Sequence, residues 1–241
     1  MSTEISSPFK FKQFQLNHDQ CPMKVGTDGV LLGAWTNVEK CNHILDVGTG
    51  CGVIAIMIAQ RNTEARILAI DIDEAASIQA NENMQATEWS SRLEAQAISI
   101  QQLSRSSTQK YDLIVSNPPF FSGGTFSNNQ DRNNIRHTVK MSHSDLLRSA
   151  QKMLTPNGRF EVILPFLEGL RFIEMAETYH LNCQKQTRVY PKKEKRIERL
   201  LLSFGFEKKE VLESSLVIQH EDRNDFTQEY IDLTKDFYLK M

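Results

Sequence analysis

Residues 43–52, HILDVGTGCG, decide the fold of this chain. The first five have the pattern of a short buried strand, a glycine-rich turn follows, and the apolar run 53–59 predicts a helix. A strand, a glycine-rich turn and a helix N-terminus together present backbone N–H groups to a ligand. The spacing is G-x-G-x-G rather than the G-x-G-x-x-G of a dinucleotide site. Asp46, just before the turn, would repel a diphosphate but could accept hydrogen bonds from an ammonium group.

A second acidic residue ends the next predicted strand. Residues 66–70 are RILAI, and Asp71 follows them, 21 positions after Gly50. An acid at the tip of the second strand is placed to accept hydrogen bonds from ribose hydroxyls. We therefore predict that Asp71 binds a nucleoside, whereas Asp73 fits a helix N-cap better.

The tetrapeptide NPPF, residues 117–120, follows another apolar strand, 111–116. Consecutive prolines donate no backbone hydrogen bond and fix their φ angles, so the carbonyl groups around them are rigid. The Asn117 side-chain oxygen and the Pro118 carbonyl would form two acceptors for one amino group, and Phe120 could stack on a planar ring. The pattern suits an exocyclic amine on a flat heterocycle or a planar amide, although a strand-ending turn would also explain it.

In this order and spacing, the motifs resemble those of the class I methyltransferases that use S-adenosylmethionine and methylate amino nitrogens. Residues 9–14 (FKFKQF), 23–35 (MKVGTDGVLLGAW) and 236–239 (DFYL) are also similar to the bacterial tRNA-valine (adenine-37-N6)-methyltransferase family. The resemblance implies a Rossmann-like α/β fold: a mostly parallel twisted sheet with an antiparallel edge hairpin and helices on both faces. It also implies S-adenosylmethionine as cofactor, tRNA as partner, and methyl transfer to N6 of the adenine beside the anticodon of tRNA(Val).

The same resemblance assigns roles to individual residues. It implies that the target nitrogen is received by Asn117, Pro118, Pro119 and Phe120. Cofactor contacts are implied for Asp46, Gly48, Thr49, Gly50, Gly52, Asp71, Ile72, Ile98, Asn117, Lys24, Thr27 and Asp28. One departure is the stretch 95–100, which lacks the acidic residue that contacts the cofactor's adenine amine in many relatives. Ser99 or the backbone N–H of Ile98 could serve instead.

The net charge of −2 does not indicate a nucleic-acid partner, but the charges are unevenly distributed. Residues 185–199 carry seven basic and two acidic side chains, and residues 207–236 carry nine acidic and four basic ones. Such a split is typical of a protein with one face toward a polyanion, although a solvated hairpin loop is an equal alternative. We predict RNA contacts for Lys192, Lys193, Lys195 and Arg196 in this region, and for Lys10, Lys12 and Arg136, which the resemblance places nearer the pocket.

Length and composition agree with one α/β unit: 241 residues, 40% hydrophobic and 24% charged. We expect residues 1–36 to pack over the cofactor site and residues 37–241 to form a single methyltransferase domain, and we expect a monomer. No apolar stretch approaches the roughly 20 residues of a membrane span, and no secretory signal is visible, so we expect a cytoplasmic protein without a membrane partner. The four cysteines form no C-x-x-C and the histidines show no ligand spacing, so we expect no metal.

The predicted strands and helices alternate, which favours a parallel sheet covered on both faces. Strands are predicted near 43–47, 66–71, 95–100, 111–116 and 158–164, helices near 51–60, 74–85, 142–153 and 166–178, and the hairpin strands near 181–190 and 199–206.

Three alternatives stay open. A methyltransferase acting on a glutamine amide would present the same NH₂ geometry to NPPF, although the N-terminal block and the basic hairpin favour RNA. A nicotinamide-dependent dehydrogenase is disfavoured by the glycine spacing and Asp46. A non-enzymatic RNA-binding protein would be expected to have a damaged NPPF, which is intact here.

Overall fold

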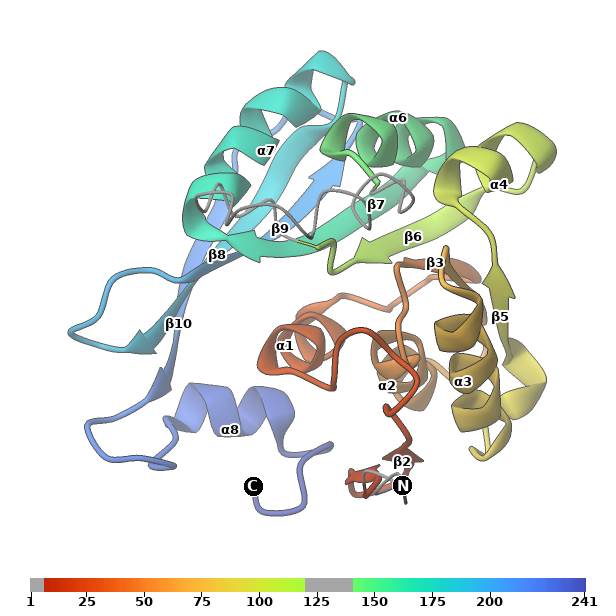
Figure 1. Ribbon diagram of the computed structural model, residues 1–241. Coiled ribbons are helices and arrows are strands. Elements are labelled where there is room, and N and C mark those ends of the chain that lie inside the picture. The colour runs from red at the N-terminus through yellow and green to blue at the C-terminus, as the bar shows by residue number, and fades with distance from the viewer. Residues whose placement is uncertain (1–6, 120–140) are drawn as a thin grey trace, which may run out of the picture.

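The structure is a computed structural model that describes residues 7–119 and 141–241. Within them, a central sheet has the strand order β10-β8-β9-β7-β6-β3-β4-β5 (Figure 1). Its strands are β3 (His43–Val47), β4 (Arg66–Asp71), β5 (Leu93–Ala97), β6 (Tyr111–Ser116), β7 (Leu154–Pro165), β8 (Asn182–Lys192), β9 (Arg199–Gly205) and β10 (Leu212–Gln219). Neighbours from β7 through β6, β3 and β4 to β5 are all parallel. The predicted α/β class with a mostly parallel sheet is confirmed.

Helices cover both faces of the sheet (Figure 1). The helices are α1 (Thr27–Trp35), α2 (Val53–Arg61), α3 (Glu74–Gln85), α4 (Ile100–Ser106), α6 (His143–Met153), α7 (Phe166–Thr178) and α8 (Gln228–Thr234). One hydrophobic cluster joins α1, α2 and α3 to one face, and a second joins α4, α6 and α7 to the other. Side chains of a strand alternate between faces, so strands buried on both sides are apolar almost throughout. This explains the mostly apolar runs that identified β3 and β6, each of which contains one aspartate.

Two sequence predictions differ from the structure. The strand predicted at 95–100 is β5, which ends at Ala97, and Ser99 caps α4 through a capping box with Gln102. The hairpin of β8 and β9 is antiparallel as predicted, but it is not the outermost part of the sheet, because β10 pairs with β8 in parallel. The sequence of β10, LESSLVIQ, lacks the apolar alternation that would have predicted a strand.

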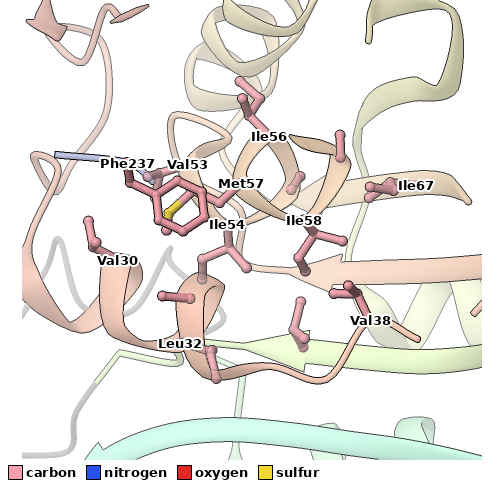
Figure 2. Close-up of a cluster of buried hydrophobic side chains, with 14 of the residues drawn as sticks. Val30, Leu32, Val38, Val53, Ile54, Ile56, Met57, Ile58, Ile67 and Phe237 are labelled. Atoms are coloured by element: carbon pink, nitrogen blue, oxygen red, sulfur yellow. The ribbon is translucent and has the colours of Figure 1, made fainter. Parts of the chain in front are cut away.

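Helix α1 accounts for much of the 23–35 block. Its residues from Gly29 to Ala34 are buried, and Figure 2 shows Val30 and Leu32 in the cluster that contains Met57 of α2. A Cβ on Gly33 would lie 2.9 Å from the Met57 sulfur, so a glycine is needed for this close approach. The glycines of the block therefore set the distance between α1 and α2.

The N-terminal strands β1 (Phe9–Lys10) and β2 (Gln15–Leu16) pair with each other and pack on the C-terminal segment. Phe11 is buried, and its ring stacks on Phe14 and Tyr238 with centroid distances of 4.5 and 6.0 Å. The aromatic side chains here belong to the core. None of the helices in the described ranges is long and apolar enough to cross a membrane.

Candidate functional site

The glycine-rich turn after β3 is held against the end of β4. The backbone N–H groups of Gly48 and Thr49 both donate to the Ile70 carbonyl, over 2.8 and 3.1 Å. Gly48, Gly50 and Gly52 have φ angles of 72°, 54° and 88°, in the left-handed region that favours glycine. The local backbone therefore requires the G-x-G-x-G spacing.

The three glycines face different surroundings. A Cβ on Gly48 or Gly50 would meet no atom within 4 Å, whereas a Cβ on Gly52 would lie 3.3 Å from the Met84 side chain of α3. The first two glycines thus border open space in which a ligand can approach the backbone. Gly52 instead faces α3.

Asp46 lies beneath this turn and is fully buried. Its Oδ2 accepts a hydrogen bond from the Thr49 hydroxyl at 2.7 Å, which links the strand to the turn. Burial raises the pKa of Asp46 to about 7, although the bond from Thr49 opposes this shift. The carboxyl group therefore changes its charge near neutral pH.

This raised pKa predicts a defined pH dependence of stability. Between about pH 4 and about pH 7 the folded protein binds more protons at Asp46 than the unfolded chain, so the free energy of unfolding should fall as pH rises through this window. Asp46→Asn should remove that part of the fall, because its amide does not titrate. Urea unfolding of both proteins at pH 5 and pH 8 measures the difference, and an identical pH dependence would contradict the assignment.

Asp71, at the end of β4, braces the turn from the other side. Its Oδ2 accepts a hydrogen bond from the Gly50 N–H at 2.9 Å, and its Oδ1 accepts one from the Asp73 N–H at 3.0 Å. Asp73 caps α3 through Ala76, as predicted. The Asp71 carboxylate is thereby fixed beside the turn, and each oxygen retains acceptor capacity for a ligand hydroxyl.

The structure brings Asn117 next to the same turn, although nearly seventy residues separate them in sequence. Strands β3 and β6 are parallel neighbours in which Val47 pairs with Ser116, and the Ser116 hydroxyl donates to the Val47 carbonyl at 2.8 Å. Gly48 and Asn117 are the first residues after the two strands. The Asn117 Oδ1 is buried and has no hydrogen-bond partner among the described residues. It is therefore an available acceptor at the carboxyl edge of the sheet, where open α/β sheets bind their ligands.

A cavity of about 280 Å³ connects these features. The predicted site residues that line it are Gly48, Gly50, Asp71, Ile72, Ile98, Asn117 and Pro119. Its other lining residues are Pro22, Met23, Val47, Ile70, Asp73, Ile100, Gln101 and Met141. Of these, Gln101 lies on α4, and the Ser99-x-x-Gln102 capping pattern could have revealed that helix in the sequence.

Other predicted site residues lie outside the cavity lining. Asp28 forms an ion pair with Arg199 at 2.8 Å, and Lys24 and Thr27 are exposed nearby. Ile98 itself lines the cavity, but its N–H already donates to the Asp71 carbonyl at 2.9 Å.

Thr49 and Gly52 are buried within the turn, and Pro118 is buried before Pro119. Phe120 and Arg136 lie outside the described residues. No group of three or more His, Cys, Asp or Glu side chains in the described part of the chain could hold a metal ion.

The predicted basic residues fall into two groups. Within the described ranges Lys193, Lys195 and Arg196 form no ion pair and are exposed, while Lys192 donates to the Glu221 carbonyl. At the other end of the chain, the Lys12 ammonium donates to the Lys235 and Met241 carbonyls. Lys10 is exposed on β1.

The loop between β8 and β9 leaves the sheet at the edge that carries Asn117. Arg199 at the start of β9 pairs with Pro165 at the carboxyl end of β7, which runs parallel to β6. The ion pair of Arg199 with Asp28 joins this loop to the start of α1.

Comparisons with known proteins identify the family and the fold to which the chain is similar. The family described as methyltransferase small domain matches residues 25–186. The chain is 42% identical to a tRNA1(Val) (adenine(37)-N6)-methyltransferase of Pectobacterium carotovorum over 97% of this chain and 94% of that protein. It is also 42% identical to the protein of the same name from Haemophilus influenzae, over 97% and 99%. Among solved structures, a predicted O-methyltransferase from Agrobacterium tumefaciens has the same fold, with a TM-score of 0.69 and 15% identity over 87% of this chain and 96% of that one.

Proposed function

Because the chain belongs to the tRNA1(Val) (adenine(37)-N6)-methyltransferase family, we propose that it transfers a methyl group from S-adenosylmethionine to N6 of adenine 37 in tRNA(Val). The observation that carries this proposal is that Gly48 and Asn117 directly follow the paired ends of the neighbouring strands β3 and β6. It sets the proposed cofactor-binding turn beside an acceptor for an amino group.

The described residues fit this cofactor. The open space over Gly48 and Gly50 accommodates a ligand against the turn, and the Asp71 carboxylate beside it suits ribose hydroxyls. The apolar side chains of Ile72, Ile98 and Met141 line the same cavity and suit the flat faces of a purine. When bound, S-adenosylmethionine supplies a methyl group that its sulfonium makes electrophilic.

The chain's own residues would position the substrate amine. Asn117 Oδ1 and the Pro118 carbonyl accept the two N6 protons, which draws the nitrogen lone pair out of conjugation and directs it toward the methyl group. The buried setting of Asn117 strengthens these bonds because little water competes. The target adenosine leaves the stack of its loop to reach this pocket, as base-modifying enzymes require. Because the amine is held in line with the methyl group, the reaction needs no catalytic nucleophile from the protein.

Methylation of unmodified tRNA tests the proposed function. The protein would be incubated with S-adenosylmethionine and total tRNA from a strain that lacks its gene, and the tRNA digested and analysed for nucleosides. We expect N6-methyladenosine at position 37 of tRNA(Val). Methyl transfer to glutamine in protein, with tRNA unchanged, would identify the amide-methyltransferase alternative instead.

Asp71 provides a test of the cofactor site. Asp71→Ala should weaken S-adenosylmethionine binding by roughly 1.5–3 kcal/mol, the range for hydrogen bonds to a charged group. Asp112→Ala is the matched control, because the Asp112 carboxylate also accepts two backbone N–H bonds, from Asn42 and His43 at 2.9 and 3.1 Å, but lies at the start of β6. Titration calorimetry should separate the two variants. Wild-type affinity in folded Asp71→Ala would remove Asp71 from the site.

We also propose that the loop between β8 and β9 contacts the tRNA backbone. This loop leaves the sheet at the same edge that carries Asn117. Its exposed Lys193, Lys195 and Arg196 concentrate positive charge on a protein whose net charge is −2. Phosphate contacts in such a position hold the RNA without reading its sequence. Lys10 and Arg136 are the alternative contacts.

Salt dependence measures these contacts. Changing Lys192, Lys193, Lys195 and Arg196 together to alanine should weaken tRNA binding and lower the slope of log K against log salt by up to about one unit per contact removed. S-adenosylmethionine affinity should stay unchanged. Lys208 and Lys209, exposed after the opposite end of β9, supply the control double variant. A parental slope in the quadruple variant would show a merely solvated loop and favour the N-terminal segment.

We propose, finally, that the protein acts as a monomer in the cytoplasm.

A further inference from the structure

Two cysteine side chains meet where the N-terminal segment passes the glycine-rich turn. Cys21 directly precedes Pro22 and Met23, which line the cavity, and Cys51 lies between Gly50 and the helix α2. The two thiols lie close enough for each to influence the pKa of the other, and both cysteines are free. Neither thiol has a role in the methyl transfer proposed above.

Side chains of helix α3 bond both of the segments that carry the two cysteines. The Asn83 amide donates to the Asn17 carbonyl and to the Cys51 carbonyl, each over 2.8 Å. One side chain thus bonds both the N-terminal segment and the turn. The Cys21 thiol in addition donates to the Gln79 Oε1 at 3.1 Å. In Figure 1 the chain between β2 and α1 runs beside α2 and α3, as these contacts require.

The surroundings give the two thiols different properties. The neighbouring Cys21 side chain and the backbone N–H of Val53 at the start of α2 lower the pKa of Cys51, although burial opposes them. The neighbouring Cys51 side chain and burial raise the pKa of Cys21. Cys51 therefore carries more thiolate character. Cys51 is only 4% exposed, so a small oxidant reaches it more readily than a bulky disulfide reagent does. Cys21 is more accessible to solvent than Cys51.

We propose that Cys21 and Cys51 form a reversible disulfide when the protein reacts with hydrogen peroxide. The Cys51 thiolate attacks one peroxide oxygen, the O–O bond breaks, and the departing hydroxide takes up a proton to become water. The Cys21 thiol then attacks the sulfur of the Cys51 sulfenic acid. The S–O bond breaks, and its oxygen leaves as a second water with the Cys21 proton. The two thiols lose two electrons in total, and the peroxide gains them; a dithiol reductant reverses the change.

The disulfide would tie the cavity wall to the glycine-rich turn. Pro22 and Met23 follow Cys21 directly, and the Gly50 backbone borders the same cavity beside Cys51. A covalent bond between the two segments prevents them from moving apart. We therefore expect the entry and release of S-adenosylmethionine to slow in the oxidised protein. This consequence rests on the proposed cofactor site, whereas formation of the disulfide does not.

Peptide mapping tests the bond directly. After treatment with stoichiometric peroxide and alkylation of the remaining thiols, mass spectrometry should find a peptide pair linked through Cys21 and Cys51 that has lost two hydrogens and separates on reduction with dithiothreitol. Cys41→Ser and Cys183→Ser should form it as the wild type does. Cys21→Ser should instead retain a Cys51 sulfenic acid that dimedone traps. If both thiols of the folded wild type stay open to alkylation, or if the link involves Cys41 or Cys183, the proposal is wrong.

Cofactor exchange supplies the second measurement. The dissociation rate of S-adenosylmethionine from oxidised wild type should be several-fold lower than from reduced protein and should recover with dithiothreitol. Cys21→Ser, once its melting curve shows that it folds, should have the same rate before and after peroxide. An unchanged rate in protein that mass spectrometry shows to be cross-linked would overturn the effect on exchange. Failure of tRNA methylation alone would bear only on the proposed function.

Discussion

Asn117→Ala should lower turnover on tRNA by about 100- to 1,000-fold, the usual cost of removing one oriented hydrogen-bonding group from a transition state. The Asn117 Oδ1 is buried and available, and its position after Ser116 is fixed by the hydrogen bond to Val47. The variant therefore loses an acceptor from a rigid place without disturbing the strand. S-adenosylmethionine should still bind, because the proposed partner of Asn117 is the substrate amine. Single-turnover kinetics and calorimetry measure the two effects separately.

Asn117→Asp is the matched variant for this experiment. It keeps a side-chain oxygen of nearly the same reach, so it should retain more turnover than the alanine variant. Ser116→Ala, which removes only the bond to the Val47 carbonyl, tests whether the strand register alone positions Asn117. Near-normal turnover of Asn117→Ala on tRNA would rule out the proposed displacement geometry.

The sequence predicted the central sheet well because its strands are buried on both faces. Apolar runs such as 43–47 and 111–116 leave little choice of structure, and positive φ angles require the glycines after them. The same pattern does not extend to β10, whose residues from Leu212 to Ser215 are exposed. Its pairing with β8 depends on tertiary contacts between distant segments, which local pattern does not encode.

The sequence located the backbone around the glycine-rich turn better than it located the side chains that line the cavity. Strand tips converge at one edge of a parallel sheet, so Asp71 and Asn117 could be placed near the turn from spacing alone. Lys24, Thr27 and Asp28 came only from resemblance, and the structure has Asp28 paired with Arg199. Met23 lines the cavity because of the path of the loop before α1. Gln101 lines it because it lies on α4, a helix that was not predicted. Such contacts depend on how elements pack, which a single sequence does not reveal.

The glycine-rich turn allows a test that separates binding of a ligand from stability of the fold. Gly50→Ala should cost about 1–2 kcal/mol of stability, because an L-residue is strained at a φ of 54°. The added methyl group meets no protein atom within 4 Å, so the rest of the turn should keep its structure. In the complex, however, it would occupy the space of the ligand. We expect S-adenosylmethionine affinity to fall by about 10- to 200-fold, the range for one misplaced methylene in a binding pocket.

Gly52→Ala is the control that separates backbone strain from loss of space for the ligand. Its φ of 88° imposes a similar strain, but the new Cβ would lie 3.3 Å from Met84 on α3 instead of bordering the cavity. This variant should therefore lose at least as much stability while its cofactor affinity falls less than that of Gly50→Ala. Denaturant unfolding and calorimetry at a temperature where both variants are folded give the comparison. Equal affinities in Gly50→Ala and the wild type would mean that the cofactor does not bind in the open space over the turn. A methyl group added where the cofactor binds would have to change its affinity.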